Sequence, residues 1–242
     1  MLSSGSSSHL AMPDYSLYLP RVLGYPFFVA TGAVLFSVMS IYLFENSFTA
    51  GFVFSIVLSI VSFLYLIAYV GITRFIDLDR RLRARDKMLS GIQWQGNETV
   101  LDVGCGNGIL TFGAAKKLTV GKVTGIDIWS DRAGDSSLEK FNRNALVEGV
   151  VDKVEFQNVD VCELEYADAC FDVILCGLAM HHIAHGESFD RAISEMVRVL
   201  KPGGWIVVYD IALIIFFCKR QLRHYSLDIS QISKNIIICQ KI

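Results

Sequence analysis

Three glycines alternate with other residues directly after a short apolar run that contains an aspartate. The run covers residues 99–103 and includes Asp102, and Gly-Cys-Gly-Asn-Gly follows at 104–108. Glycine has no Cβ, so a ligand can approach such a turn closely, and a helix that begins there offers unpaired N–H groups. The dinucleotide fingerprint needs its third glycine one position later, where this chain has Ile109. The spacing therefore disfavours NAD and FAD, and Asp102 suits a cationic group better than a pyrophosphate.

Two further acids follow apolar runs later in the chain. Asp127 ends the run at 122–127, and Asp160 follows the run at 153–158. Open α/β sheets bind ligands at the carboxyl ends of their strands. There Asp127 could accept both hydroxyls of a ribose, and Asp160 could accept a proton from an adenine amino group. Either acid alone could equally be a turn former or a helix cap, but the ordered set of acids and glycines indicates a nucleoside site.

The elements that must position these residues alternate between short apolar runs and helical stretches. This alternation is typical of crossover units and predicts a doubly wound α/β fold with a mostly parallel sheet. We expect strands at 99–103, 122–127, 153–158, 171–176 and 205–209, and helices at 109–118, 138–148 and 189–200.

Residues 100–108, Val-Leu-Asp-Val-Gly-Cys-Gly-Asn-Gly, resemble the first motif of the class I S-adenosylmethionine-dependent methyltransferases. The later landmarks of that family follow in order at 123–127, 158–160, 171–176 and 198–204. The resemblance covers about residues 88–210. It implies a Rossmann-like sheet, S-adenosyl-L-methionine as the cofactor, and methyl transfer as the reaction.

The resemblance also implies roles for single residues around the methionine and ribose parts of the cofactor. Asp102 would hold the methionine amino group, directly or through water. Gly104 and Gly106 would let the backbone approach the methionine and the ribose. Asp127 would bind the ribose hydroxyls.

Around the adenine and the methyl group, the resemblance implies a second set of contacts. Ile128 and Trp129 would pack on the adenine. Asp160 would bond its amino group, and the Val161 N–H would bond a ring nitrogen. Cys176, at the end of the fourth strand, would line the amino-acid end of the cofactor near the methyl group.

Three histidines, His181, His182 and His185, follow the fourth strand. A methyl acceptor whose proton must leave needs a general base, and histidine titrates near neutral pH. His181 and His182 are therefore candidate catalytic residues, although either could simply pack or hydrogen-bond within its loop. Residues 177–180, Gly-Leu-Ala-Met, lack the Asn/Asp-Pro-Pro-aromatic motif of many nucleic-acid methyltransferases, so no nucleic-acid partner is expected.

The first third of the chain has a different composition. The whole chain is 52% hydrophobic and 19% charged, and its apolar residues concentrate in two uncharged segments, 22–44 and 47–73. At about 1.5 Å per residue, a helix of either length would cross a hydrocarbon core of about 30 Å. The sequence therefore predicts a transmembrane helical hairpin, with the lipid bilayer as a partner. A pair of buried core helices is the alternative.

These features divide the chain into four parts. Residues 1–21 form a serine-rich arm expected to be flexible, 22–73 the hairpin, 74–94 a basic linker helix, and 95–242 the methyltransferase domain. Because basic residues cluster after the second apolar segment, the positive-inside rule places the catalytic domain on the cytoplasmic side of the membrane.

The six cysteines form no C-x-x-C pair and no Cys/His ligand set. This spacing predicts reduced, structural thiols and no metal site.

The C-terminus departs from the family pattern. Only 32 residues follow Asp210, beginning with the apolar run at 211–217. That run is too short to span a bilayer and could form a core helix or an interfacial one. One closing strand is expected at 236–239, which would leave the sheet edge incomplete.

The leading hypothesis is thus a membrane-anchored methyltransferase that acts on a small acceptor. The hairpin would keep the site at the bilayer, which favours a lipophilic acceptor. The shortened C-terminus supports a second hypothesis, a non-catalytic membrane protein whose methyltransferase-like domain binds a nucleoside or a partner. A nucleotide-dependent oxidoreductase is the third, and the glycine spacing disfavours it.

Overall fold

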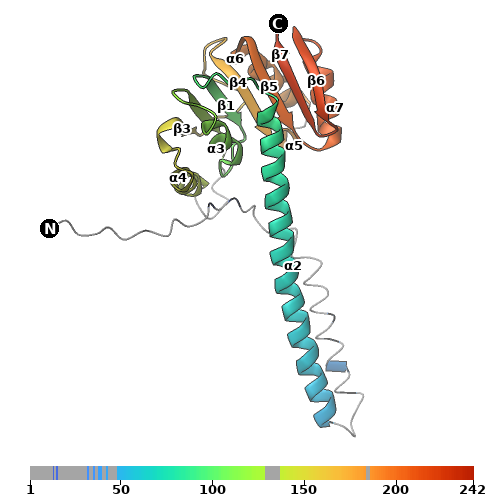
Figure 1. Ribbon diagram of the computed structural model, residues 1–242. Helices are drawn as coiled ribbons and strands as arrows, with labels where there is room; N and C mark the ends of the chain where they lie inside the picture. Colours follow the sequence, from blue (N-terminus) through green and yellow to red (C-terminus); the bar gives the residue numbers. More distant parts are fainter. Residues whose placement is uncertain are drawn as a thin grey trace, which may run out of the picture. The chain divides into compact units, whose positions relative to one another are not determined.

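The computed structural model describes residues 48–128, 137–183 and 186–242, together with positions 13, 15, 32, 35, 38, 39 and 42. The chain divides into two compact units. One unit contains residues 1–15 and 81–242, and the other contains residues 16–80. The larger unit is built around one seven-stranded sheet (Figure 1).

The sheet has the strand order β3-β2-β1-β4-β5-β7-β6. The first five strands in this order are parallel, and β7 lies antiparallel to both β5 and β6. This arrangement confirms the predicted α/β fold with a mostly parallel sheet. The strands are β1 (Thr99–Val103), β2 (Lys122–Ile126), β3 (Val154–Gln157), β4 (Phe171–Gly177), β5 (Leu200–Tyr209), β6 (Leu227–Ser233) and β7 (Ile236–Lys241).

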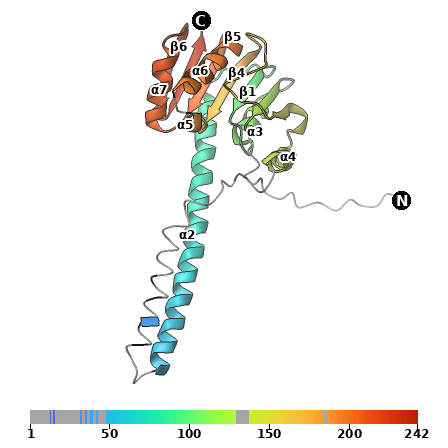
Figure 2. The ribbon, with the colours of Figure 1, turned by 180° about the vertical axis from the view of Figure 1, so that it is seen from behind.

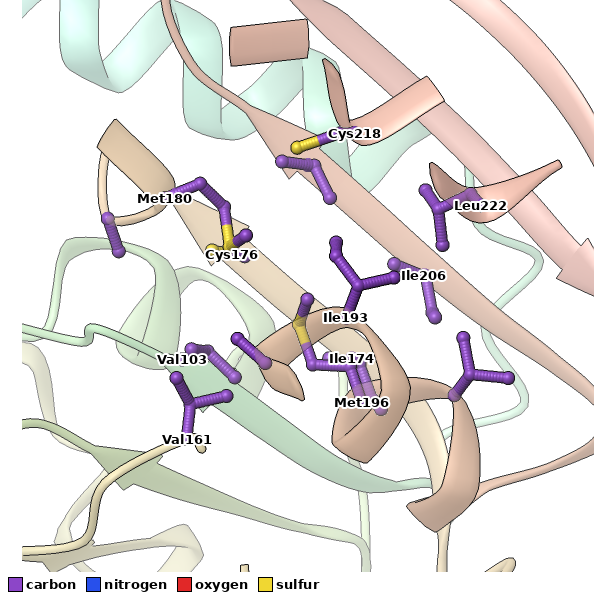
Figure 3. Packing of buried hydrophobic residues seen from close by; sticks show 14 of the residues in the cluster. Val103, Val161, Ile174, Cys176, Met180, Ile193, Met196, Ile206, Cys218 and Leu222 are labelled. Carbon is purple, nitrogen blue, oxygen red and sulfur yellow. The ribbon is translucent and has the colours of Figure 1, made fainter. Parts of the chain in front are cut away.

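Helices cover both faces of this sheet (Figures 1 and 2). On one face, Ile193 and Met196 pack against Ile174 and Ile206 of the central strands (Figure 3). On the other face, the last residues of α2 pack against α3 and β7, around Leu89. The helices are α2 (Phe48–Ser90), α3 (Ile109–Ala115), α4 (Ser137–Glu148), α5 (Met180–Ile183), α6 (Glu187–Val199) and α7 (Ala212–Leu222).

The C-terminal segment is more complete than the sequence predicted. The run after Asp210 continues as α7, and β6 pairs with β7 along its length. The expectation of an incomplete sheet edge with one closing strand is therefore wrong. Leu227 and Ile229 alternate with exposed polar residues along β6, which is the period-2 pattern of a half-buried strand. That pattern was missed because the strand contains few apolar residues.

The second apolar segment and the basic linker form one continuous helix, α2. The structure does not support the predicted transmembrane hairpin: over the residues it describes, no helix is long and apolar enough to cross a membrane. Of the first predicted span, only positions 32, 35, 38, 39 and 42 are described. The prediction for the rest of that span lies outside the described residues.

The N-terminal arm is fixed to the larger unit at Tyr15. The ring of Tyr15 is buried, and its centroid lies 6.5 Å from that of Phe112. Its hydroxyl donates to Glu148, and Arg81 Nη1 donates to its carbonyl oxygen at 2.7 Å. At this residue the structure differs from the flexible arm that the serine-rich sequence predicted.

All six cysteines are free. Cys105, Cys176, Cys218 and Cys239 are buried. They act as small apolar residues in the core of the larger unit.

The C-terminal strand pair can be tested through Ile237 of β7, which is fully buried. We expect Ile237→Ala to lower the free energy of unfolding by about 2–5 kcal/mol, because the substitution leaves a cavity in a packed core. Ile242→Ala is the matched control, since Ile242 is 82% exposed and should change stability by less than about 0.5 kcal/mol. Thermal unfolding of the two variants, followed by circular dichroism, compares them. Equal melting temperatures would show that β7 is not part of the core.

Candidate active site

The glycine turn after β1 is bonded to the end of β2. Gly104 and Cys105 both donate their backbone N–H groups to the carbonyl oxygen of Ile126, at 2.8 and 3.0 Å. Gly106 donates its N–H to Oδ2 of Asp127 at 2.8 Å. The turn and Asp127 are thus held together at the carboxyl edge of the sheet, where ligands bind in this class of fold.

Two of the glycines in this turn serve different purposes. Gly104 has φ +68°, and a Cβ there would lie 2.3 Å from the Cβ of Ala179, so glycine is required for packing. Gly106 has φ +50°, and a Cβ there would have no neighbour within 4 Å. The space beside Gly106 is therefore open, as close approach of a ligand to the backbone requires.

Asp102 is completely buried beneath this turn. Its Oδ2 accepts a hydrogen bond from Thr111 Oγ1 at 2.6 Å, and its Oδ1 has no partner. Burial raises the pKa of Asp102 to about 7, against the hydrogen bonds from Thr111, and the nearby Asp127 adds to the rise. A buried oxygen without a partner is rare in proteins, and an ammonium group or a water molecule would satisfy it. The predicted role of Asp102 fits this environment.

Asp127 lies at the end of β2, as the sequence predicted. Its pKa is raised by burial, while the N–H groups of Gly106 and Ile128 and the positive charge of His182 oppose the rise. The side chain of Ile128 is 59% exposed, so it presents apolar surface next to this carboxylate. Trp129 lies outside the described residues.

Asp160 and Val161 follow β3. Asp160 is exposed, and its Oδ1 accepts the N–H of Cys162 at 2.8 Å. This hydrogen bond stabilises a turn. A turn-forming role was the structural alternative to cofactor binding for Asp160. The side chain of Val161 lies in the core (Figure 3), so its backbone is the part left for a ligand, as its predicted role requires.

The side chain of Cys176 is completely buried and packs in the core close to Met180 (Figure 3). Burial also raises the pKa of its thiol well above the ordinary value. The backbone of Cys176 is therefore the part left for a ligand, and its role beside the cofactor stays a prediction. Every residue from Val173 to Cys176 is apolar, so the sequence did not reveal which face each side chain takes.

The chain turns sharply after β4 and brings His181 to the end of β5. Leu178 has φ +57°, which is strained for a branched residue, and its N–H donates to the carbonyl oxygen of Tyr209 at 2.7 Å. The His181 ring nitrogen Nδ1 then lies 3.1 Å from Oδ1 of Asp210, and the His181 backbone N–H donates to Oδ2 at 3.2 Å. The rings of His181 and His182 lie side by side, with centroids 4.0 Å apart.

Sequence reasoning did not identify Asp210 as a site residue. It is completely buried, and its Oδ1 also accepts the N–H of Ile211 at 2.7 Å. The same strand-end rule that identified Asp127 applies to Asp210, which directly follows β5. Thr111 was also missed, because nothing in the sequence links it to Asp102. His185 lies outside the described residues.

One protein family matches the residues that carry most of this site. The family is described as a methyltransferase domain, and its match covers residues 101–208. Residues 101–208 of this chain are thus similar to this family of methyltransferase domains. The match runs from β1 to β5, and it includes the glycine turn, Asp127 and the histidine pair.

Named relatives of the methyltransferase domain support this assignment. The 27-O-demethylrifamycin SV methyltransferase of Amycolatopsis mediterranei is 34% identical over 134 residues, which cover 54% of this chain and 45% of the relative. The demethylmenaquinone methyltransferase of Symbiobacterium thermophilum is 38% identical over 112 residues, covering 46% and 41%. This chain therefore spans less than half the length of either relative.

Solved structures agree on the fold. The crystal structure of a SAM-dependent methyltransferase from Aquifex aeolicus superimposes with a TM-score of 0.51 at 18% identity. The match covers 64% of this chain and 87% of that one. At this level of identity, the similarity concerns the fold of the methyltransferase domain alone.

The open space at Gly106 can be tested by substitution. We expect Gly106→Ala to weaken the binding of S-adenosylmethionine at least about tenfold, because its Cβ would occupy space that a ligand needs. Gly149→Ala is the matched control, since Gly149 also has a positive φ of +68° and no atom within 4 Å of a built Cβ. Calorimetric titration of both variants measures the difference. Equal weakening would mean that backbone strain, rather than ligand space, is responsible.

The raised pKa of Asp102 predicts a pH dependence of stability. The fold favours the protonated acid, so its contribution is complete below about pH 4 and is lost as the pH rises to about 7. Asp102→Asn, which cannot ionise, should therefore gain stability relative to the wild type over this range, by up to about 4 kcal/mol. Denaturant unfolding at pH 4 and pH 8 measures this gain. A difference that does not change with pH would contradict the assignment.

Proposed function

We propose that the whole protein transfers a methyl group from S-adenosylmethionine to a hydroxyl group of a small, lipophilic acceptor. The observation that carries this proposal is the His181–Asp210 pair, which lies at the same carboxyl edge of the sheet as the glycine turn. When bound, the cofactor supplies an activated methyl group on a sulfonium centre. The protein must then position an acceptor atom and remove its proton.

The residues around the glycine turn fit the cofactor. Asp102 offers an oxygen without a partner to the methionine ammonium group, directly or through water. Asp127 offers its carboxylate to the ribose hydroxyls, and Gly106 leaves its neighbouring space open. Ile128 offers apolar surface to the adenine. Asp160 would accept a hydrogen bond from the adenine amino group with Oδ2, because its Oδ1 already accepts the N–H of Cys162.

His181 is suited to act as the general base. Asp210 accepts the Nδ1–H of the imidazole, which fixes the tautomer and leaves Nε2 as the nitrogen that can accept a proton. The buried carboxylate also stabilises the imidazolium that forms when the acceptor hydroxyl loses its proton. The ring of His182 lies beside that of His181, with centroids 4.0 Å apart, and a positive charge on His182 lowers the pKa of Asp127. This places His182 between the proposed base and the cofactor side.

The proposal of a lipophilic hydroxyl acceptor is supported by the named relatives and by the presence of a base. The named relatives are methyltransferases of a rifamycin and of a demethylmenaquinone. Both names denote small, lipophilic molecules. A base such as His181 is useful for a hydroxyl acceptor, since its proton must leave during transfer.

We also propose that the apolar segment at 22–73 attaches the protein to a lipid bilayer, with the methyltransferase domain on the cytoplasmic side. Along α2, the large apolar side chains described between Ile56 and Ile67 are 43–61% exposed. Exposed apolar surface of this extent is typical of membrane or protein contact. Basic residues from Arg80 to Lys87 follow this surface in the same helix, as the positive-inside rule expects on the cytoplasmic side.

The scaffold hypothesis has lost its motivation. It depended on a shortened C-terminus, whereas α7, β6 and β7 continue the domain beyond β5. The glycine spacing that disfavours a nucleotide-dependent oxidoreductase also stands.

The proposed chemistry can be tested at His181 and Asp210. We expect His181→Asn to lower kcat about 10²- to 10⁴-fold without changing cofactor affinity, because the variant lacks a base. Asp210→Asn should also lower kcat and change its pH profile, since the tautomer of His181 is no longer fixed. Transfer of a labelled methyl group to phenol and quinol acceptors in mixed micelles measures kcat, with His224→Asn, an exposed histidine, as the control. If His181→Asn retained wild-type kcat, the base assignment would be wrong.

A further inference from the structure

Helix α7 is apolar on two opposite sides, although it lies at the surface of the domain. One side packs into the core through Ile214, Ile215, Cys218 and Leu222. The other side exposes Leu213, Phe216 and Phe217, with exposed fractions from 42% to 61%. A helix at the surface of a domain normally exposes polar side chains opposite its buried side, and neighbouring exposed apolar side chains are typical of a contact with a membrane or another protein.

The exposed residues form a continuous stripe. Phe216, Phe217 and Arg220 follow Leu213 by three, four and seven positions. This spacing places all four residues on one face of a helix. The rings of Phe216 and Phe217 are in edge-to-face contact, with centroids 5.6 Å apart. We call this face, made of Leu213, Phe216, Phe217 and Arg220, the outer face of α7.

One end of the outer face is positively charged. Lys219, Arg220 and Arg223 follow the aromatic pair, and residues 211–227 contain no acid. Arg220 and Arg223 are exposed, whereas Lys219 donates to Gln231 of β6 at 3.1 Å. Large apolar side chains combined with basic residues are typical of helices that lie in the interface of a membrane containing anionic lipids.

We propose that the outer face of α7 docks on the surface of an anionic lipid bilayer. This inference rests on the proposed function, because a lipophilic acceptor would reach the site from that bilayer. Helix α7 begins two residues after Asp210, the partner of His181. Docking therefore brings the proposed base to the lipid surface. A second copy of the chain fits less well, because a two-fold contact would bring the same arginines into one interface.

Fluorescence quenching by lipid tests this proposal on the full chain in bilayer vesicles. The Phe216→Trp variant places a reporter on the outer face, and Leu146→Trp places the control on α4. Leu146 is 65% exposed, and α4 carries balanced charges. With brominated anionic lipids, we expect the added quenching relative to the wild type to be at least about twice as large for Phe216→Trp. Equal quenching of the two variants would overturn the proposal.

The contribution of the two arginines can be tested in the same experiment by changing either the protein or the lipid charge. Arg220→Ala combined with Arg223→Ala should reduce the quenching of Phe216→Trp to the control level, as should neutral brominated lipids. Each arginine near an anionic surface changes partitioning about fivefold. Quenching that is independent of both changes would mean that the apolar stripe meets something other than an anionic surface.

Two further measurements separate this inference from the proposed function. Flotation of the full chain with vesicles after an alkaline wash tests attachment through residues 22–73, and cofactor titration tests the methyltransferase site. If both succeed and the two tryptophan variants are quenched equally, the docking proposal alone fails. If flotation fails but added vesicles still quench Phe216→Trp selectively, the outer face binds lipid and the attachment proposal fails. Cross-linking between copies through the outer face, without lipid quenching, would identify a second chain as its partner.

Discussion

The carbonyl oxygen of Ile126 receives two hydrogen bonds from the turn after β1, and the rest of the site is built on this contact. Gly104 and Cys105 donate to it together, and Gly106 donates to the carboxylate of the next residue along, Asp127. These three hydrogen bonds therefore fix the position of the glycine turn relative to the end of β2. Gly125 makes this close packing possible, since a Cβ there would lie 2.9 Å from the sulfur of Cys105. The position of Asp127 and the shape of the glycine turn are set by the same contact.

The sequence predicted those parts of the site that are local to one strand and the turn after it. Asp102, the glycines and Asp127 could be placed because each lies at or directly beside the carboxyl end of an apolar run. The pairing of His181 with Asp210 could not be predicted, because it depends on the register between β4 and β5 and on the positive φ of Leu178. The burial of the Cys176 side chain could not be predicted for a related reason. A strand that is buried on both faces has no polar residues to reveal the orientation of its side chains.

The two sides of the carboxyl edge differ in how much the fold determines them. Gly106 and Asp127 occupy the cofactor side, where the family match is informative. His181, Asp210 and the outer face of α7 occupy the side that follows β4 and β5, and α7 lies beyond the matched residues. Since one fold can support many chemistries, the identity of the acceptor depends on this second side. Its pair of a buried carboxylate and an imidazole suits the removal of a proton from an acceptor hydroxyl.

The burial of Asp102 has a consequence for how the domain would capture a cation. With a pKa of about 7, the carboxyl group is largely protonated in slightly acidic solution, so an incoming ammonium group must displace a proton to form an ion pair. Capture is then an exchange of one positive charge for another, with little change in the net charge of the buried site. The heat of such an exchange includes the ionisation of the buffer that takes up the proton. The number of protons released thus reports directly how much of the acid was neutral before the ligand arrived.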